Sequence, residues 1–205
     1  MMEQSRPQPS AEPERPRLAP DQEPHPEPAS LREAVQHYLR DLVYGANDGI
    51  ITTFAVVAGV AGADLPAVTV LILGFANLVA DGFSMGASNF LAIRSNEAAR
   101  AAAGLGVEEP HAGRHGFATF AAFLVAGSVP LVAYLIPGVD EGRFAIATAL
   151  TLATLFTVGA FRSFVTAQSW IRSGLEMLLV GAAAAAVAYA LGAMIADIVD
   201  GVPVG

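Results

Sequence analysis

Five apolar stretches, separated by short polar breaks, make up nearly all of the chain after residue 42. They cover about 42–63, 67–93, 116–137, 144–161 and 173–196. A helix needs roughly 20 apolar residues to cross a bilayer, and 17–25 are usual. A soluble bundle needs helices with a polar outer face, whereas the third and fourth stretches contain no Asp, Glu, Lys, Arg or His. The sequence therefore predicts an all-α integral membrane domain of five transmembrane helices over 42–197.

Composition agrees with a membrane location and narrows the function. Charged residues are 15% of the chain, against about 25% in a typical soluble domain. The net charge of −8 argues against a nucleic-acid partner, which would require a basic face. The chain has no cysteine and no lysine, which excludes thiol nucleophiles and Schiff-base chemistry, and its four histidines fall outside the predicted spans. We therefore expect no enzyme and no permanently bound cofactor.

The first 41 residues divide into two parts. Residues 1–30 hold eight of the 13 prolines and six acids, a composition that cannot bury enough apolar surface to fold, so we expect a disordered tail. No apolar core of a signal peptide follows the first arginines. Residues 31–41 predict an amphipathic helix. It either lies at the membrane interface or extends the first span.

Arginine placement predicts the orientation of the spans. Arginines lie before the first span, between the second and third, and around the link from the fourth to the fifth. The opposite ends carry five acids and a single arginine, Arg143. Because cytoplasmic loops are enriched in positive charge, the N-terminus is predicted in the cytosol and the C-terminus outside.

Two carboxylates, Asp48 and Asp81, fall well inside the first and second spans. Such a charge costs at least about 2.5–3.5 kcal/mol at the bilayer centre, and it usually faces a bundle interior or a water-filled path. Counting residues from the predicted ends brings the two acids toward the same depth. They therefore predict a shared cation site.

Polar residues around these acids suggest which cation is bound. On the second span Asn77, Asp81, Met85 and Asn89 recur every four residues, which places them on one slowly drifting face. Asn47 precedes the first-span acid. Oxygen ligands with one sulfur suit Fe²⁺ or Mn²⁺. Taken singly, the methionine and the asparagines would be packing residues or interhelical hydrogen-bond partners.

Glycines frame both groups of polar residues. Gly45 and Gly49 flank the first, and Gly82 and Gly86 flank Met85. Small residues four apart let helices approach closely. They also permit local unwinding that frees carbonyl groups to bind ions.

The segments DLVYGANDGIITTFAVVAGVAGA and GFANLVADGFSMGASNFLAIRSNEAAR resemble the vacuolar iron transporter (VIT) family. The resemblance extends over about 38–197. It implies a homodimer that moves Fe²⁺ or Mn²⁺ out of the cytosol in exchange for protons, through a path lined by the first two helices. It also implies that Asp48, Asp81 and Met85 are metal ligands.

The sequence departs from the family pattern at two places. Many members carry a Gly-acid-aromatic triplet where this chain has Ser88-Asn89-Phe90. Well-known members also have a Glu-rich metal-binding domain between the second and third spans, and here that link is only about 94–115. The link predicts a solvated loop, with a weak histidine and carboxylate capture site as the alternative. Its candidate ligands are Glu97, Glu108, Glu109, His111 and His115.

These observations predict a divalent metal and proton antiporter, which we expect in a prokaryotic plasma membrane, or in a vacuolar membrane if the source is eukaryotic. A non-transporting metal sensor or scaffold and a passive cation channel are the alternatives. Near the start of the fifth span, Glu176 is expected to pair with Arg172 at i,i+4. An accessory proton site is the other interpretation of this acid.

Overall fold

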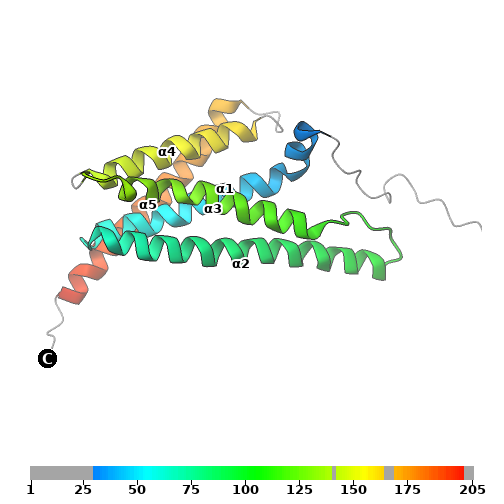
Figure 1. The fold of residues 1–205 in the computed structure, drawn as a ribbon, viewed down its shortest axis with the longest axis horizontal. Helices are drawn as coiled ribbons and strands as arrows, with labels where there is room; N and C mark the ends of the chain where they lie inside the picture. Colours follow the sequence, from blue (N-terminus) through cyan, green and yellow to red (C-terminus); the bar gives the residue numbers. More distant parts are fainter. Residues whose placement is uncertain (1–29, 140–141, 164–168, 201–205) are drawn as a thin grey trace, which may run out of the picture.

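The computed structural model describes residues 30–139, 142–163 and 169–200, which form five helices (Figure 1). They are α1 (Leu31–Gly62), α2 (Ala67–Ala102), α3 (Ala112–Leu135), α4 (Arg143–Arg162) and α5 (Trp170–Asp200). All five are long and apolar enough to cross a membrane, which confirms the predicted all-α architecture. The predicted tail, except for Ser30, lies outside the described residues.

Helix α1 includes the segment 31–41 without a break, as expected of a helical extension of the first span. Its N-terminus is capped by Ser30, whose hydroxyl oxygen accepts a hydrogen bond from the Glu33 amide at 3.2 Å. Such a cap satisfies one of the amides that a helix leaves unpaired at its start. The extension adds about three turns to α1 before the predicted span begins at residue 42.

Helix α2 is longer than the apolar stretch that predicts it. Its 36 residues extend about 54 Å at 1.5 Å per residue, whereas the hydrocarbon core of a bilayer is about 30 Å thick. The helix continues past residue 93 because its backbone hydrogen bonds do not depend on apolar side chains. It ends where Gly104 takes a left-handed conformation (φ 74°), which glycine adopts without steric cost.

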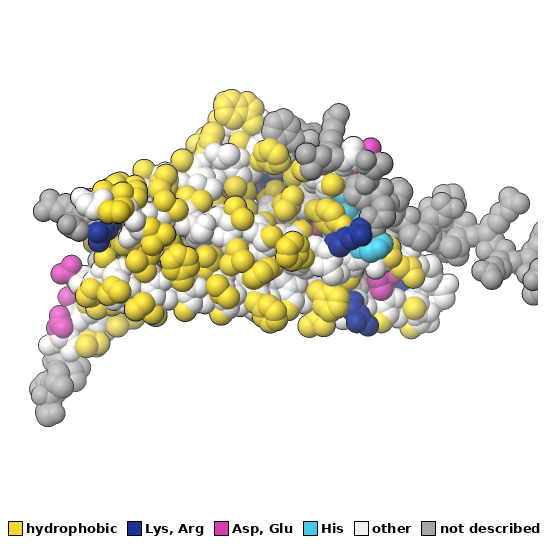
Figure 2. Space-filling model, in the orientation of Figure 1, with side chains coloured by type: hydrophobic (Ala, Val, Ile, Leu, Met, Phe, Trp, Pro, Cys, Tyr) yellow, Lys and Arg dark blue, Asp and Glu magenta, His cyan; other side chains and the backbone are white. Residues whose placement is uncertain are grey.

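Helix α1 lies at the centre of the bundle and contacts all four other helices. Helix α2 lies along one edge (Figure 1) and, among the described residues, packs only against α1 and α3. Apolar side chains cover much of the surface in Figure 2, and those of Ile72 and Phe83 on α2 are 63% and 69% exposed. Such a surface suits lipid or a protein partner rather than water.

The glycines of α1 and α2 provide close helix packing. Both helices remain regular at Gly45, Gly49, Gly82 and Gly86, so the structure does not contain the local unwinding that the sequence permits. A Cβ atom built on Gly86 would lie 2.7 Å from the carbonyl oxygen of Gly116 on α3, and a Cβ on Gly49 would meet the backbone of Phe123. Without side chains at these positions, α3 packs directly on the backbones of α1 and α2.

Candidate functional site

The two predicted carboxylates lie on neighbouring helices. Asp48 lies on α1 and Asp81 on α2, both are half-buried, and the two carboxylates are close enough to interact electrostatically. Two like charges at this separation are unfavourable unless a cation or a proton lies with them. Beside Asp48, the Thr52 hydroxyl donates to the Asp48 carbonyl oxygen at 2.8 Å, so it satisfies the backbone and leaves the carboxylate free of that contact.

Met85 follows Asp81 by one turn of α2 and packs against the core cluster that includes Phe54 and Val57 of α1. Its side chain is half-buried, as is that of Asn77 one turn before Asp81. The three residues form a single stripe along α2, on the helix that contacts α1 and α3. The thioether thus lies one turn from the Asp81 carboxylate along α2.

Asn47 faces a different part of the molecule from Asp48. It lines a cleft between α1, the end of α4 and α5, together with Arg162 and Met177. Its side-chain oxygen is buried and accepts no hydrogen bond. Adjacent residues on a helix point about 100° apart, so Asn47 and Asp48 are directed to different sides of α1.

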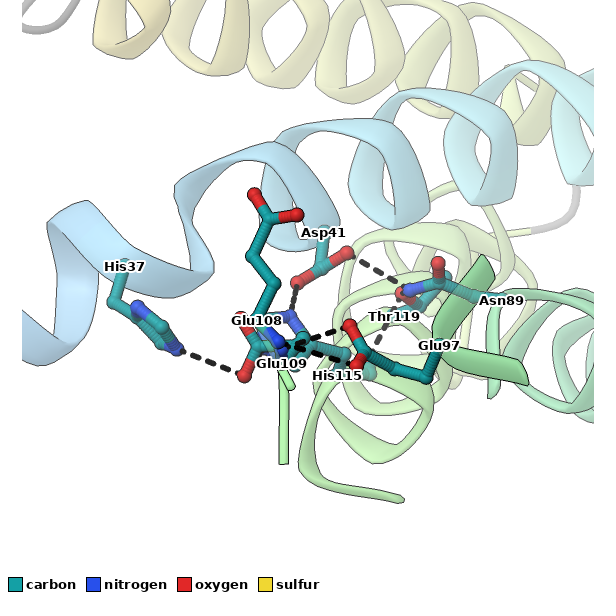
Figure 3. Close-up of polar contacts among 8 residues, drawn as sticks. All are labelled: His37, Asp41, Asn89, Glu97, Glu108, Glu109, His115 and Thr119. Carbon is teal, nitrogen blue, oxygen red and sulfur yellow. Dashed lines mark hydrogen bonds and ion pairs between the residues drawn. The ribbon is translucent and has the colours of Figure 1, made fainter. Parts of the chain in front are cut away.

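Asn89 belongs to a buried polar network of four residues, Asp41, Asn89, His115 and Thr119, which we call the Asp41 network (Figure 3). The Asn89 amide donates to Asp41 Oδ1 and to Thr119 Oγ1, both at 2.8 Å. His115 Nδ1 lies 2.5 Å from Asp41 Oδ2, and the Thr119 hydroxyl donates to the His115 carbonyl oxygen at 3.0 Å. The network ties α1, α2 and α3 together, and it leaves only the carbonyl oxygen of Asn89 to offer a metal.

The link between α2 and α3 is ordered by its own acids. Glu97 accepts hydrogen bonds from the backbone amides of Glu108 (3.1 Å) and Glu109 (2.9 Å), and the Glu108 carboxylate pairs with Arg100 at 2.8 Å. These contacts hold the link against the end of α2. The prediction of a solvated loop therefore applies to only part of this link.

Glu109 is directed toward two histidines, and these three side chains form what we call the His37 cluster (Figure 3). Glu109 Oε1 lies 3.2 Å from His115 Nε2 and 3.8 Å from His37 Nε2. The two imidazole rings are 5.0 Å apart between centroids. Ligand atoms of all three residues lie within 4.8 Å of one another, so the cluster has the dimensions of a metal site.

Glu176 takes part in ion pairs. Its carboxylate lies 3.2 Å from Arg172 Nε, the predicted i,i+4 pair, and 3.1 Å from an Arg162 nitrogen at the end of α4. Arg172 is 74% exposed, and exposed pairs of this kind stabilise a protein by at most about 1 kcal/mol. Both contacts favour the structural interpretation of Glu176.

Sequence analysis did not assign the Asp41 network or the part that His37 plays. A signal was present in the spacing, because His37, Asp41 and Asp48 fall within about 40° of one another on a helix with 3.6 residues per turn. The partners of Asp41, however, lie 48 and 74 residues away along the chain. No periodicity within one helix identifies such partners.

Known proteins similar to this chain agree on one family. The family model described as "VIT family" matches residues 39–104 and 97–193. Vacuolar iron transporter 1 of Eucalyptus grandis is 25% identical over 210 residues, covering 75% of this chain and 84% of the relative. Vacuolar iron transporter 1 of Arabidopsis thaliana is 26% identical over 211 residues, with coverage of 75% and 84%.

A shorter match has higher identity. The vacuolar iron transporter of Toxoplasma gondii is 48% identical over 54 residues, which cover 26% of this chain and 18% of that protein. All three relatives are named as transporters rather than enzymes, in agreement with the sequence prediction.

Proposed function

The chain belongs to the VIT family, and from this premise we propose that it transports divalent transition-metal ions, Fe²⁺, Mn²⁺ or both, out of the cytosol in exchange for protons. The relatives named as iron transporters support iron as the substrate. The observation that carries the proposal is the pair of carboxylates, Asp48 and Asp81, on adjacent membrane-spanning helices.

The chemistry of the surrounding side chains fits this substrate. Asp48 and Asp81 supply hard oxygen ligands and Met85 supplies a soft sulfur, a combination that suits a borderline ion better than Ca²⁺ or Mg²⁺. An ion between the carboxylates also relieves the repulsion of two like charges in a medium of low dielectric constant. We assign these three residues as the ligands of the path and Asn77 as an accessory polar residue.

Proton exchange follows from the same two carboxylates. A carboxylate in a poorly solvated site is neutral when it holds a proton, and a bound divalent cation favours the ionised form. Metal binding therefore releases protons, and protonation releases metal. One site that is exposed in turn to each side of the membrane can exchange the two.

A second copy of the chain completes the proposed path. Asp48 and Asp81 are only half-buried within one chain, and carboxylates in a membrane face a bundle interior or water rather than lipid. A homodimer that pairs the α1 and α2 sides of two chains would enclose them. Arginine placement supports the orientation in which α1 begins in the cytosol.

Uptake by proteoliposomes tests the proposal. Purified protein is reconstituted with an internal pH dye, and Fe²⁺ or Mn²⁺ is added outside. We expect metal entry with opposing proton movement, and we expect Asp48→Asn to reduce both to the level of empty liposomes. The matched control is Asp64→Asn, because Asp64 is an exposed acid in the turn after α1, and asparagine tolerates its left-handed conformation (φ 52°).

Each result leads to a definite conclusion. Metal entry without proton movement would indicate a passive channel. Metal binding without entry would indicate a sensor or scaffold. Unchanged exchange in Asp48→Asn would rule out the carboxylate pair as the path, whatever the substrate.

A further inference from the structure

We propose that the His37 cluster is a second metal site, where a divalent transition-metal ion is held by His37, Glu109 and His115 before it enters the path. The three side chains come from α1, from the link and from the first turn of α3. The site is therefore formed by tertiary packing, and no sequence motif spans it. Its transport role rests on the proposed function, whereas metal binding at the cluster does not.

Asp41 prepares His115 to act as a ligand. An ionised carboxylate only accepts hydrogen bonds, so the short contact between Asp41 Oδ2 and His115 Nδ1 requires the proton to be on Nδ1. In the neutral ring, Nε2 then carries a lone pair. Metal-binding histidines commonly have this arrangement, in which a carboxylate on one ring nitrogen fixes the tautomer and raises the basicity of the other.

The free nitrogen of His115 is directed into the cluster and lacks a hydrogen-bond partner. The side chain is 9% exposed, and Nε2 makes no hydrogen bond although Glu109 Oε1 lies 3.2 Å away. A buried polar atom without a partner is costly, and a lone pair that faces a carboxylate oxygen is repulsive. A cation between the two atoms removes both costs.

The ligand set indicates the class of ion. Two imidazole nitrogens and one carboxylate oxygen, with further positions open to water, suit Fe²⁺ and also accept Co²⁺ or Zn²⁺. An all-oxygen site would be expected for Ca²⁺ or Mg²⁺. Glu109 lines a surface cleft of about 520 Å³, and His37 lines another of about 440 Å³, so the cluster is accessible from outside the bundle.

The position of the cluster suits capture. His37, Asp41 and Asp48 share one face of α1, and His37 precedes Asp48 by 11 residues, or roughly 16 Å along the helix. The cluster is therefore at the end of α1 that arginine placement assigns to the cytosol, about three turns before Asp48. An ion would thus bind at the cytosolic entrance of the path. The residues that hold it belong to α1, the α2–α3 link and α3, and not to a separate cytosolic domain.

Cobalt binding to the full-length protein in detergent tests the site. The Asp48→Asn background removes the path ligand, and Co²⁺ is titrated by calorimetry and by its visible absorption. We expect one Co²⁺ per chain in this background, and at least tenfold weaker binding when His37→Gln or Glu109→Gln is added. Glu108→Gln is the matched control, since that neighbouring acid pairs with Arg100 instead.

Asp41→Asn tests the positioning role. We expect it to weaken cobalt binding by about 10–100-fold, the usual effect of losing a carboxylate behind a ligating histidine. Asp41 is buried, so its variant is interpreted only if the circular dichroism spectrum of the background is retained. The His37 and Glu109 variants lie nearer the surface and keep the proposal testable without it.

Equal cobalt affinity in the background and in both cluster variants would overturn the proposal. So would a complete absence of binding, which would leave the cluster as a proton-bridged network. In uptake assays on the native sequence, His37→Gln and Glu109→Gln should raise the KM for metal several-fold and leave kcat nearly unchanged. Failure of the proposed function looks different, because cobalt would still bind at the cluster while no protein variant supported proton-coupled uptake.

Discussion

The amide of Asn89 donates both of its hydrogens, one to Asp41 and one to Thr119, and this explains why an amide replaces the acid expected from the family resemblance. Asp41 already accepts from His115 on its other oxygen. A carboxylate at position 89 would place a second negative charge against Asp41 with no proton to share. Asparagine at position 89 therefore supplies the donors that the other three residues of the Asp41 network require.

Asn89→Asp should destabilise the protein. The substitution removes a donor from two buried acceptors, and an unsatisfied buried group costs about 1–3 kcal/mol. We expect a corresponding loss in the free energy of unfolding, measured by thermal melting in detergent at neutral pH. The control is Asn96→Asp, an exposed position further along α2. Equal melting temperatures for the two variants would contradict the role given to the Asp41 network.

At the scale of the helices, glycine positions determine how closely α2 and α3 approach. Gly86 and Gly116 face each other, and a Cβ atom on either would lie 2.7 Å from the carbonyl oxygen of the other. Backbone oxygens cannot move aside as flexible side chains do. The contact also fixes the spacing between Asn89 on α2 and Thr119 on α3, which each lie three residues beyond one of these glycines.

Gly86→Ala should therefore force the two helices apart. Overpacking of this kind typically costs about 1–3 kcal/mol, and we expect a matching loss of thermal stability. Gly113→Ala provides the control, because Gly113 also lies in α3 and has no atom within 4 Å of an added Cβ. Alanine there should be neutral or stabilising by about 1 kcal/mol, from helix propensity alone. A destabilised Gly113→Ala beside an unaffected Gly86→Ala would reverse this assignment.

At the scale of the helices, the sequence predicts which segments are helical but not how the helices pack. Apolar length identified all five helices, because a membrane requires about 20 apolar residues per span. It did not predict the end of α2 at Ala102, since the last turns are polar and still helical. The relation between Asp48 and Asp81 could be expected from depth along neighbouring spans. The contact of His115 with Asp41 could not, because it depends on how α3 packs on α1.

At the scale of the whole molecule, charge is distributed unevenly between the two ends of the bundle. Most of the arginine and histidine side chains visible in Figure 2 lie near one end, with one dark blue group at the other, and acids mark the far end of α5. Asp197 and Asp200 lie in the last turns of that helix. The C-terminal end of α2 lies at the opposite end of the bundle (Figure 1). This asymmetry is the basis of the proposed orientation.

Single cysteines test the orientation cleanly, because the native chain has none. In right-side-out vesicles, a membrane-impermeant maleimide should label Asp197→Cys directly. It should label Asn96→Cys, near the end of α2, only after the membrane is permeabilised. The opposite labelling pattern would show that the protein has the reverse orientation in the membrane, and the proposed direction of transport would then be reversed as well.

Assembly is the last property that belongs to the whole molecule. Helix α2 contacts only α1 and α3 among the described residues, and Ser84, three residues after Asp81 and about 60° from it around the helix, is exposed. If two copies enclose the path, this side of α2 must face its counterpart. In native membranes, a short bismaleimide should then convert Ser84→Cys to a covalent dimer. Leu179→Cys, 67% exposed on α5, should remain monomeric. Cross-linking of the α5 cysteine alone would move the interface to α5 and leave Asp48 and Asp81 without a partner subunit.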